Sequence, residues 1–107
     1  MTPFLFVILY LLNVDAAAAG AWKACRFQNL VIGCRDQHHS DGSVRILWQD
    51  GRVLTYRVVK PGFPVSRLYD RSGQLWQREI LVQGNAVFTN LATGQRFVVP
   101  LRAESQP

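Results

Sequence analysis

The chain has 107 residues, with 12 Lys and Arg against 7 Asp and Glu, so its formal net charge is +5. From this length we expect one small domain. The basic excess directs attention to anionic partners.

Residues 1–21 are expected to be a helical export signal. Residues 4–12 form an unbroken apolar run, and a row of small residues follows shortly after it. An apolar core followed by small residues matches a cleavable signal, and the run is shorter than the roughly 18 residues that span a bilayer. We expect cleavage after Ala21; the alternative is an uncleaved N-terminal anchor. Cleavage removes one Asp and no Lys or Arg, which leaves twelve basic against six acidic residues, a balance of +6.

Residues 22–103 are expected to form one small domain, with 104–107 as a disordered tail. A domain of this size buries a modest core and often needs a cross-link. The two cysteines, Cys25 and Cys34, can supply one in an exported protein. We predict a Cys25–Cys34 disulfide, which would contribute about 2.5–3 kcal/mol in the chain-entropy model. Free thiols or pairing between two chains are the alternatives.

The segment SVRILWQDGRVLTYRVV contains two β-branched and aromatic runs joined by Asp50-Gly51. This dipeptide favours a two-residue type I′ hairpin turn. The turn would place Trp48 opposite Val53, and Arg45 opposite Tyr56 on the other face of the ribbon.

The remainder of the chain reads as further strands. Residues 60–64, KPGFP, form a connection, because proline removes backbone donors and fixes φ. Further turns are expected at 70–73, at 84–85 and around 93–94, and residues 25–34 form a first hairpin or a strand and a turn. We therefore predict an all-β fold: a small antiparallel meander of six to seven strands that closes as a barrel or a sandwich.

The stretch CRDQHHSDG, residues 34–42, contains the residue types that bind metals. On an extended chain Asp36 and His38 could share one face, and His39 and Asp41 the other. Either pair supplies two ligands, whereas a catalytic zinc takes three from the protein. We interpret the stretch as a solvated loop and expect no metal or other cofactor.

Catalytic patterns are also missing from the sequence. There is no GxSxG motif, and Glu79 is the one acid inside a predicted strand, where a salt bridge with the neighbouring Arg78 explains it. We expect a protein that is not an enzyme. A metal-binding protein or small enzyme centred on residues 34–41 is the alternative.

Arginine dominates the basic residues, with ten of the twelve cations. Its planar fork suits phosphate, sulfate and carboxylate, and it stacks on aromatic rings. The candidates for an arginine and aromatic binding surface are Arg45, Trp48, Tyr56, Arg57 and Trp76.

Export to the periplasm or the medium makes nucleic acid an unexpected partner. Acidic envelope polysaccharide or lipid headgroups are expected instead. Two alternatives remain open: arginines spread over every strand can simply keep a surface solvated, or an exposed edge strand can pair with a protein partner.

The segments WQDGRVLTYR (48–57) and LYDRSGQLWQRE (68–79), followed by QGNAVFTN, resemble small exported proteins of cyanobacteria that have no assigned function. The resemblance covers most of the chain after the signal. It implies export to the periplasm or the medium, and it carries no catalytic residues.

Overall fold

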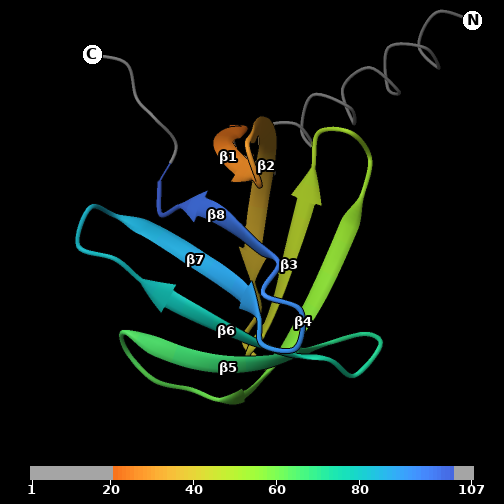
Figure 1. Cartoon of the computed structure of the whole chain (residues 1–107), viewed down its shortest axis with the longest axis vertical. Coiled ribbons are helices and arrows are strands. Elements are labelled where there is room, and N and C mark those ends of the chain that lie inside the picture. Colours follow the sequence, from red (N-terminus) through yellow and green to blue (C-terminus); the bar gives the residue numbers. More distant parts are fainter. Residues whose placement is uncertain (1–20, 103–107) are drawn as a thin grey trace, which may run out of the picture.

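The computed structural model describes residues 21–102; the predicted tail and all but the last residue of the predicted signal lie outside them. The described chain is an antiparallel β-barrel in which each strand pairs with the next and β8 pairs with β1 (Figure 1). The strands are β1 (Lys23–Phe27), β2 (Leu30–His38), β3 (Ser43–Trp48), β4 (Val53–Lys60), β5 (Val65–Asp70), β6 (Leu75–Ile80), β7 (Asn85–Asn90) and β8 (Arg96–Pro100).

The predicted all-β antiparallel meander is confirmed, and it closes as a barrel. The strand count is eight instead of six to seven. The interpretation of residues 34–42 as a loop is wrong for its first half, because Cys34–His38 belong to β2 and pair with β3 from Cys34↔Trp48 to His38↔Val44. The loop begins only at His39.

Four turns share one hydrogen-bond pattern. In each, the first residue donates its N–H to the carbonyl of the fifth, and a glycine in fourth place donates its N–H to the carbonyl of the first. This is a three-residue hairpin loop that requires positive φ at the glycine, and Gly51 has φ of 101°. The four turns span residues 39–43, 48–52, 70–74 and 81–85.

The turn at 48–52 corrects the predicted register of the β3–β4 hairpin. With one more residue in the loop than expected, Val44 faces Tyr56 and Arg45 faces Thr55. A shift of one residue moves side chains to the opposite face of a strand relative to their partners. Tyr56 therefore points to the same side as Trp48, into the barrel, and away from Arg45.

The barrel interior is filled by aromatic rings around Phe97. This ring stacks on Phe88 at 4.6 Å between centroids and meets Trp48 edge-on at 5.3 Å. Tyr56 and Trp76 contact it from the other strands. Aromatic pairs at these distances add stability beyond their buried area, so the core is centred on a cluster of rings.

The predicted Cys25–Cys34 disulfide is confirmed. It joins β1 to β2, both sulfur-bearing residues are fully buried, and their Cα atoms lie 5.7 Å apart. The described residues contain no free cysteine. A disulfide is typical of an oxidising compartment.

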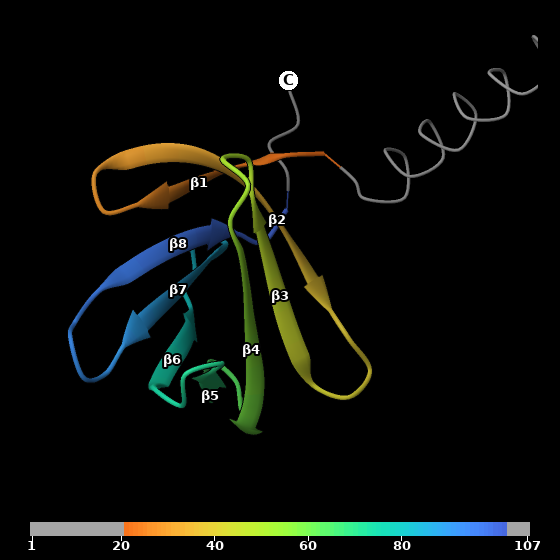
Figure 2. The same cartoon turned by 90° about the vertical axis from the view of Figure 1, so that its right-hand side faces the viewer.

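The two ends of the barrel differ in chemistry. The β1–β2, β3–β4, β5–β6 and β7–β8 connections lie at one end, here called the aromatic end, and the remaining connections lie at the other, the polar end. Figure 2 shows the β1–β2 and β7–β8 turns on the left and the β2–β3 turn on the right. Inward-facing Trp48, Tyr56 and Trp76 lie towards the aromatic end, whereas Lys23 and Asp36 lie towards the polar end. Residues 21–102 contain no helix that is long and apolar enough to cross a membrane.

Candidate functional sites

The five predicted binding residues do not lie on one surface. Trp48 and Tyr56 are 2% exposed and Trp76 is 6% exposed, and all three point into the barrel. Arg45 and Arg57 are exposed on the outside. The corrected β3–β4 register is the reason, since it places the aromatic residues of this hairpin on the inner face and the arginines on the outer face.

The outer face of β2–β5 carries one arginine on each strand. Arg45 and Arg67 each lie between two buried residues, so their own side chains point outward. Arg35 and Arg57 face outward for the same reason of alternation. We call these four residues, Arg35, Arg45, Arg57 and Arg67, the arginine row.

The arginine row runs diagonally across the sheet. Arg35, Arg45 and Arg57 stand opposite Leu47, Thr55 and Tyr69, respectively, on the next strand. On each of these strands the next arginine lies two positions closer to the polar end. Diagonal neighbours of this kind lie about 7–8 Å apart. The row therefore extends over roughly 20–25 Å along the backbone ladder. The Arg35 guanidinium, at one end of the row, lies over the Trp22 ring at 3.8 Å.

Among residues 21–102, no arginine of the row forms an ion pair within 4.0 Å. Arg52, which is not part of the row, pairs with Asp50. Most described carboxylates are already engaged: Asp36 faces inward, and Asp41, Asp50 and Asp70 are held in turns. Glu79 lies on the outer face of β6, beside the end of the row. The row consequently presents positive charge that the protein itself does not neutralise.

A groove of about 570 Å³ lies on the barrel beside the middle of the row. It is lined by Thr55, Arg57, Tyr69, Asp70, Arg71 and Gly73. The Asp70 carboxylate already accepts hydrogen bonds from Ser72, Gln74 and Trp76. The Tyr69 side chain is 38% exposed and stands opposite Arg57 in the β4–β5 ladder. An anion with an apolar face can be held here between cationic and aromatic groups.

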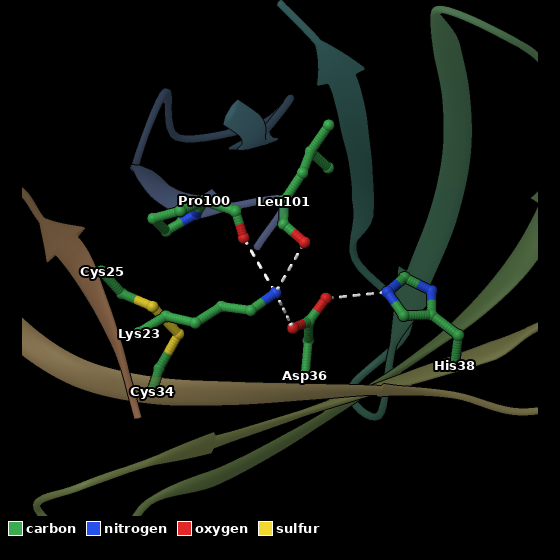
Figure 3. Close-up of a disulfide and its surroundings, with 7 residues drawn as sticks. All are labelled: Lys23, Cys25, Cys34, Asp36, His38, Pro100 and Leu101. Carbon is green, nitrogen blue, oxygen red and sulfur yellow. Dashed lines mark hydrogen bonds and ion pairs between the residues drawn. A yellow bond between two sulfur atoms is a disulfide. The ribbon is translucent and has the colours of Figure 1, made fainter. Parts of the chain in front are cut away.

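At the polar end, an ion pair and a hydrogen bond link three side chains (Figure 3). Lys23 Nζ donates to Asp36 Oδ1 at 2.7 Å, and His38 Nε2 lies 2.8 Å from Asp36 Oδ2. Burial raises the pKa of Asp36, but hydrogen bonds from His38 and Lys23 more than offset this and lower it to about 2. The carboxylate is therefore ionised and accepts from both partners, so Nε2 of His38 carries the proton.

Lys23 also closes the barrel at this end. Its ammonium donates to the carbonyl of Pro100 at 2.9 Å and to that of Leu101 at 3.1 Å. The β1–β8 ladder itself contains only the pairs Arg26↔Val98 and Phe27↔Phe97. The lysine side chain thus bridges the two strands where their backbones no longer pair.

The predicted metal-ligand residues divide into two groups. Asp36 and His38 share a face, as their spacing predicts, but the Asp36 carboxylate is already bound to Lys23. Asp41 and His39 lie in the turn, where Asp41 accepts from the N–H and hydroxyl of Ser43. Residues 21–102 bring together no group of three or more potential ligands.

Arg78 is an inward-facing cation that the sequence did not reveal. It stands between Ser66 and Phe88 in the ladders, both of which are buried, and its Nε has no hydrogen-bond partner. Burial lowers the pKa of Arg78, and the charge of Asp36 acts in the opposite direction. The expected pair with Glu79 is absent, because adjacent residues of a strand point to opposite faces.

A second hollow opens at the aromatic end of the barrel. It has a volume of about 370 Å³, and its floor includes Tyr56 and Trp76. Arg52 lies at its edge, with its guanidinium carbon 4.9 Å from the Phe27 ring and 5.2 Å from the Trp48 ring. We call this hollow the mouth pocket. The sequence analysis did not predict this pocket, because it assumed a two-residue turn at Gly51. A three-residue loop there would have placed Trp48 and Tyr56 together on the inner face of the hairpin.

Comparison with known proteins adds no family assignment: no family model, no curated protein and no solved structure matches this chain. The arginine row, the polar end and the mouth pocket are therefore the features from which a function can be inferred.

Proposed function

We propose that this protein is an exported, non-enzymatic binding protein that holds an anionic polymer of the cell envelope along its arginine row. The observation that carries the proposal is the diagonal of four outward-facing arginines with no carboxylate within 4.0 Å. Guanidinium groups that the protein leaves unpaired favour binding of sulfate, phosphate or carboxylate groups from outside.

The buried disulfide supports placement of the protein in the periplasm or outside the cell, since such bonds persist in oxidising compartments. The polymers available there include acidic polysaccharides. A flexible chain can follow a row that winds across four strands of a curved barrel, whereas a flat layer of lipid headgroups would meet only part of it. We therefore favour an acidic polysaccharide.

The edge-strand alternative receives less support. Every strand from β1 to β8 is paired on both sides, and closure of a barrel leaves only the short β1–β8 seam with unpaired edge positions. The arginine row is accordingly a better candidate for the binding surface than any strand of the described barrel.

Affinity chromatography on immobilised heparin, used as a model polyanion, tests the proposal. The double variant R45Q/R57Q removes two charges from the row, and R26Q/R96Q removes two exposed charges from β1 and β8 as a matched control. We expect salt to elute the wild type and the control at similar concentrations and the row variant much earlier, because counterion release makes such binding depend steeply on salt.

Two results would contradict the proposal. If both double variants lose retention equally, net charge and not the row determines binding. If the wild type is not retained even at low salt, the arginines act only as a solvated surface.

A further inference from the structure

The mouth pocket is distinct from the arginine row and has the composition of a small-molecule site. Ligand sites often occur in the mouths of β-barrels, and they combine apolar walls with a few polar groups in volumes of roughly 300–1,000 Å³. The mouth pocket, at about 370 Å³, falls within this range. Its apolar walls are formed by Phe27, Leu54, Tyr56 and Trp76.

Two polar residues hold the rim in place and have little capacity left for a ligand. Asp70 accepts from the N–H and hydroxyl of Ser72 and from the N–H of Gln74 through Oδ1, and from the indole N–H of Trp76 through Oδ2 at 2.9 Å. Asn90 donates to Gln74 Oε1 and accepts two backbone N–H groups of the β7–β8 loop. These bonds fix the rim before any ligand enters.

The polar groups that remain available are mainly donors. Gln74 uses its side-chain oxygen on Asn90, which leaves its amide N–H₂ group towards the pocket. Tyr56 lines the pocket, and burial raises the pKa of its hydroxyl, which therefore stays protonated. Gln95 completes this set.

Arg52 supplies the charge of the pocket. Its Nε contacts Asp50 at 3.1 Å, and both side chains of this pair are more than 40% exposed. Exposed ion pairs contribute little, typically about 0–1 kcal/mol, so the guanidinium can exchange or share this partner. The terminal nitrogens of Arg52 can then form charge-assisted hydrogen bonds with an acid group over the ring of Phe27.

We propose that the mouth pocket binds a carboxylate carried on a single six-membered ring, with the ring among Phe27, Tyr56 and Trp76 and the acid group at Arg52. Two sources share this chemistry: a free aromatic acid and a uronic acid at the end of a polysaccharide. The second would link the pocket to the polymer proposed for the arginine row, but the pocket proposal does not depend on that function.

The test is a ligand titration of the exported protein, monitored by the NMR signal of the Trp76 indole N–H. This group lies in the pocket and donates a hydrogen bond to Asp70. The probes are 4-hydroxybenzoate and glucuronate, with 4-hydroxybenzamide and glucose as uncharged counterparts. We expect one of the two acids to give a saturable shift. Its uncharged counterpart should bind at least about tenfold more weakly, because it lacks the charge-assisted hydrogen bond.

Variants locate the acid group. R52Q is expected to weaken binding of the acid about tenfold or more, whereas R45Q, on the outer face, leaves the affinity within about twofold. Y56F retains the ring and removes only a hydroxyl, and it should weaken binding by a smaller factor. Arg52 is exposed, so R52Q is not expected to disturb folding.

Each outcome decides the proposal. Saturation by 4-hydroxybenzoate alone identifies a free aromatic acid, and saturation by glucuronate alone identifies a polysaccharide end. No saturation with either acid at about 10 mM, well above the weak end of specific binding, overturns the proposal, as does unchanged affinity in R52Q or equal binding of the uncharged counterparts. Heparin retention with R45Q/R57Q reports on the arginine row separately, so the two proposals can fail independently.

Discussion

The carboxylate of Asp36 is held on both sides, by Lys23 at 2.7 Å and by His38 at 2.8 Å. Its pKa falls from 3.8 to about 2 on folding. A lowered pKa stabilises the folded state above the unfolded pKa, and this contribution is lost as the pH falls through the folded pKa. The shift corresponds to about 2 kcal/mol.

We predict that the free energy of unfolding of the wild type falls by about 2 kcal/mol more than that of D36N when the pH is lowered from about 5 to about 2. The asparagine has a similar shape and does not titrate, so it serves as the control for all other groups. Urea denaturation at the two pH values measures the difference. Parallel pH dependence in the two proteins would show that the Asp36 bonds do not stabilise the fold.

Residue-level reasoning from the sequence was accurate where only local geometry mattered. The spacing of Asp36 and His38 correctly placed both on one face of an extended chain. It could not show that Lys23, thirteen residues earlier, would take the same carboxylate. That contact depends on the pairing of β1 with β2, in which Lys23 lies opposite Cys34.

At the scale of elements, the turns set the faces of the barrel. The prediction of a two-residue turn at Asp50-Gly51 was wrong by one residue, since the dipeptide is also compatible with the last two positions of a three-residue loop. That single residue decides whether Tyr56 lies in the core or beside Arg45. The composition of both strands is apolar on both faces, so hydrophobic pattern alone did not select the register.

We predict that G51A lowers the free energy of unfolding by about 1–2 kcal/mol, while G51N recovers most of the loss. Gly51 has φ of 101°, a region that costs most L residues about 1–3 kcal/mol and that asparagine tolerates best. An added Cβ meets no atom within 4 Å, so the cost lies in the backbone and not in a clash. Urea midpoints of the three proteins provide the comparison, and an equal loss in both variants would indicate a different cause.

The strand β2 was partly mistaken for a loop because its inward face becomes polar after Cys34. Asp36 is unusual in a barrel interior, and the sequence offered no sign that Lys23 would compensate its charge. His38, on the same face, is largely exposed. The same limit applies to Arg78 on β6. Polar side chains in an interior are recognisable only once their partners from distant strands are known.

The seam between β1 and β8 should open before the rest of the barrel. Its ladder has two residue pairs, and Lys23 bridges the remainder through Pro100 and Leu101. We predict that K23M increases amide hydrogen exchange in β1 and β8 more than in β3 and β4, because the seam opens locally before the barrel unfolds. A uniform increase over all strands would show that Lys23 contributes only to global stability.

At the scale of the whole molecule, the aromatic core and the disulfide stabilise the barrel in different ways. The ring cluster around Phe97 joins strands that are far apart in sequence, from Trp48 on β3 to Phe88 on β7. The disulfide, by contrast, closes a short loop between strands that already pair with each other. Burial of the rings should therefore determine the fold, and the disulfide should raise the melting temperature of a barrel that can fold without it.

We predict that the reduced protein remains folded at 25 °C but melts at a lower temperature. Loss of the ten-residue ring removes about 2.5–3 kcal/mol in the chain-entropy model, which is less than the roughly 5–15 kcal/mol that stabilises a typical domain. For a domain of this size the loss corresponds to a fall in Tm of roughly 10–20 °C. Circular dichroism melts with and without reductant measure it, with alkylation and mass analysis to confirm that both thiols are free.

The variant C25A/C34A is the control for effects of the reductant itself, because its Tm should not respond to reduction. Both cysteines are fully buried, so this variant also loses packing and should melt at or below the temperature of the reduced wild type. If reduction leaves the Tm of the wild type unchanged, the disulfide adds no stability to the folded barrel beyond that of the β1–β2 ladder. If reduction unfolds the protein at 25 °C, the aromatic core cannot maintain the barrel, and the division of roles between rings and disulfide is incorrect.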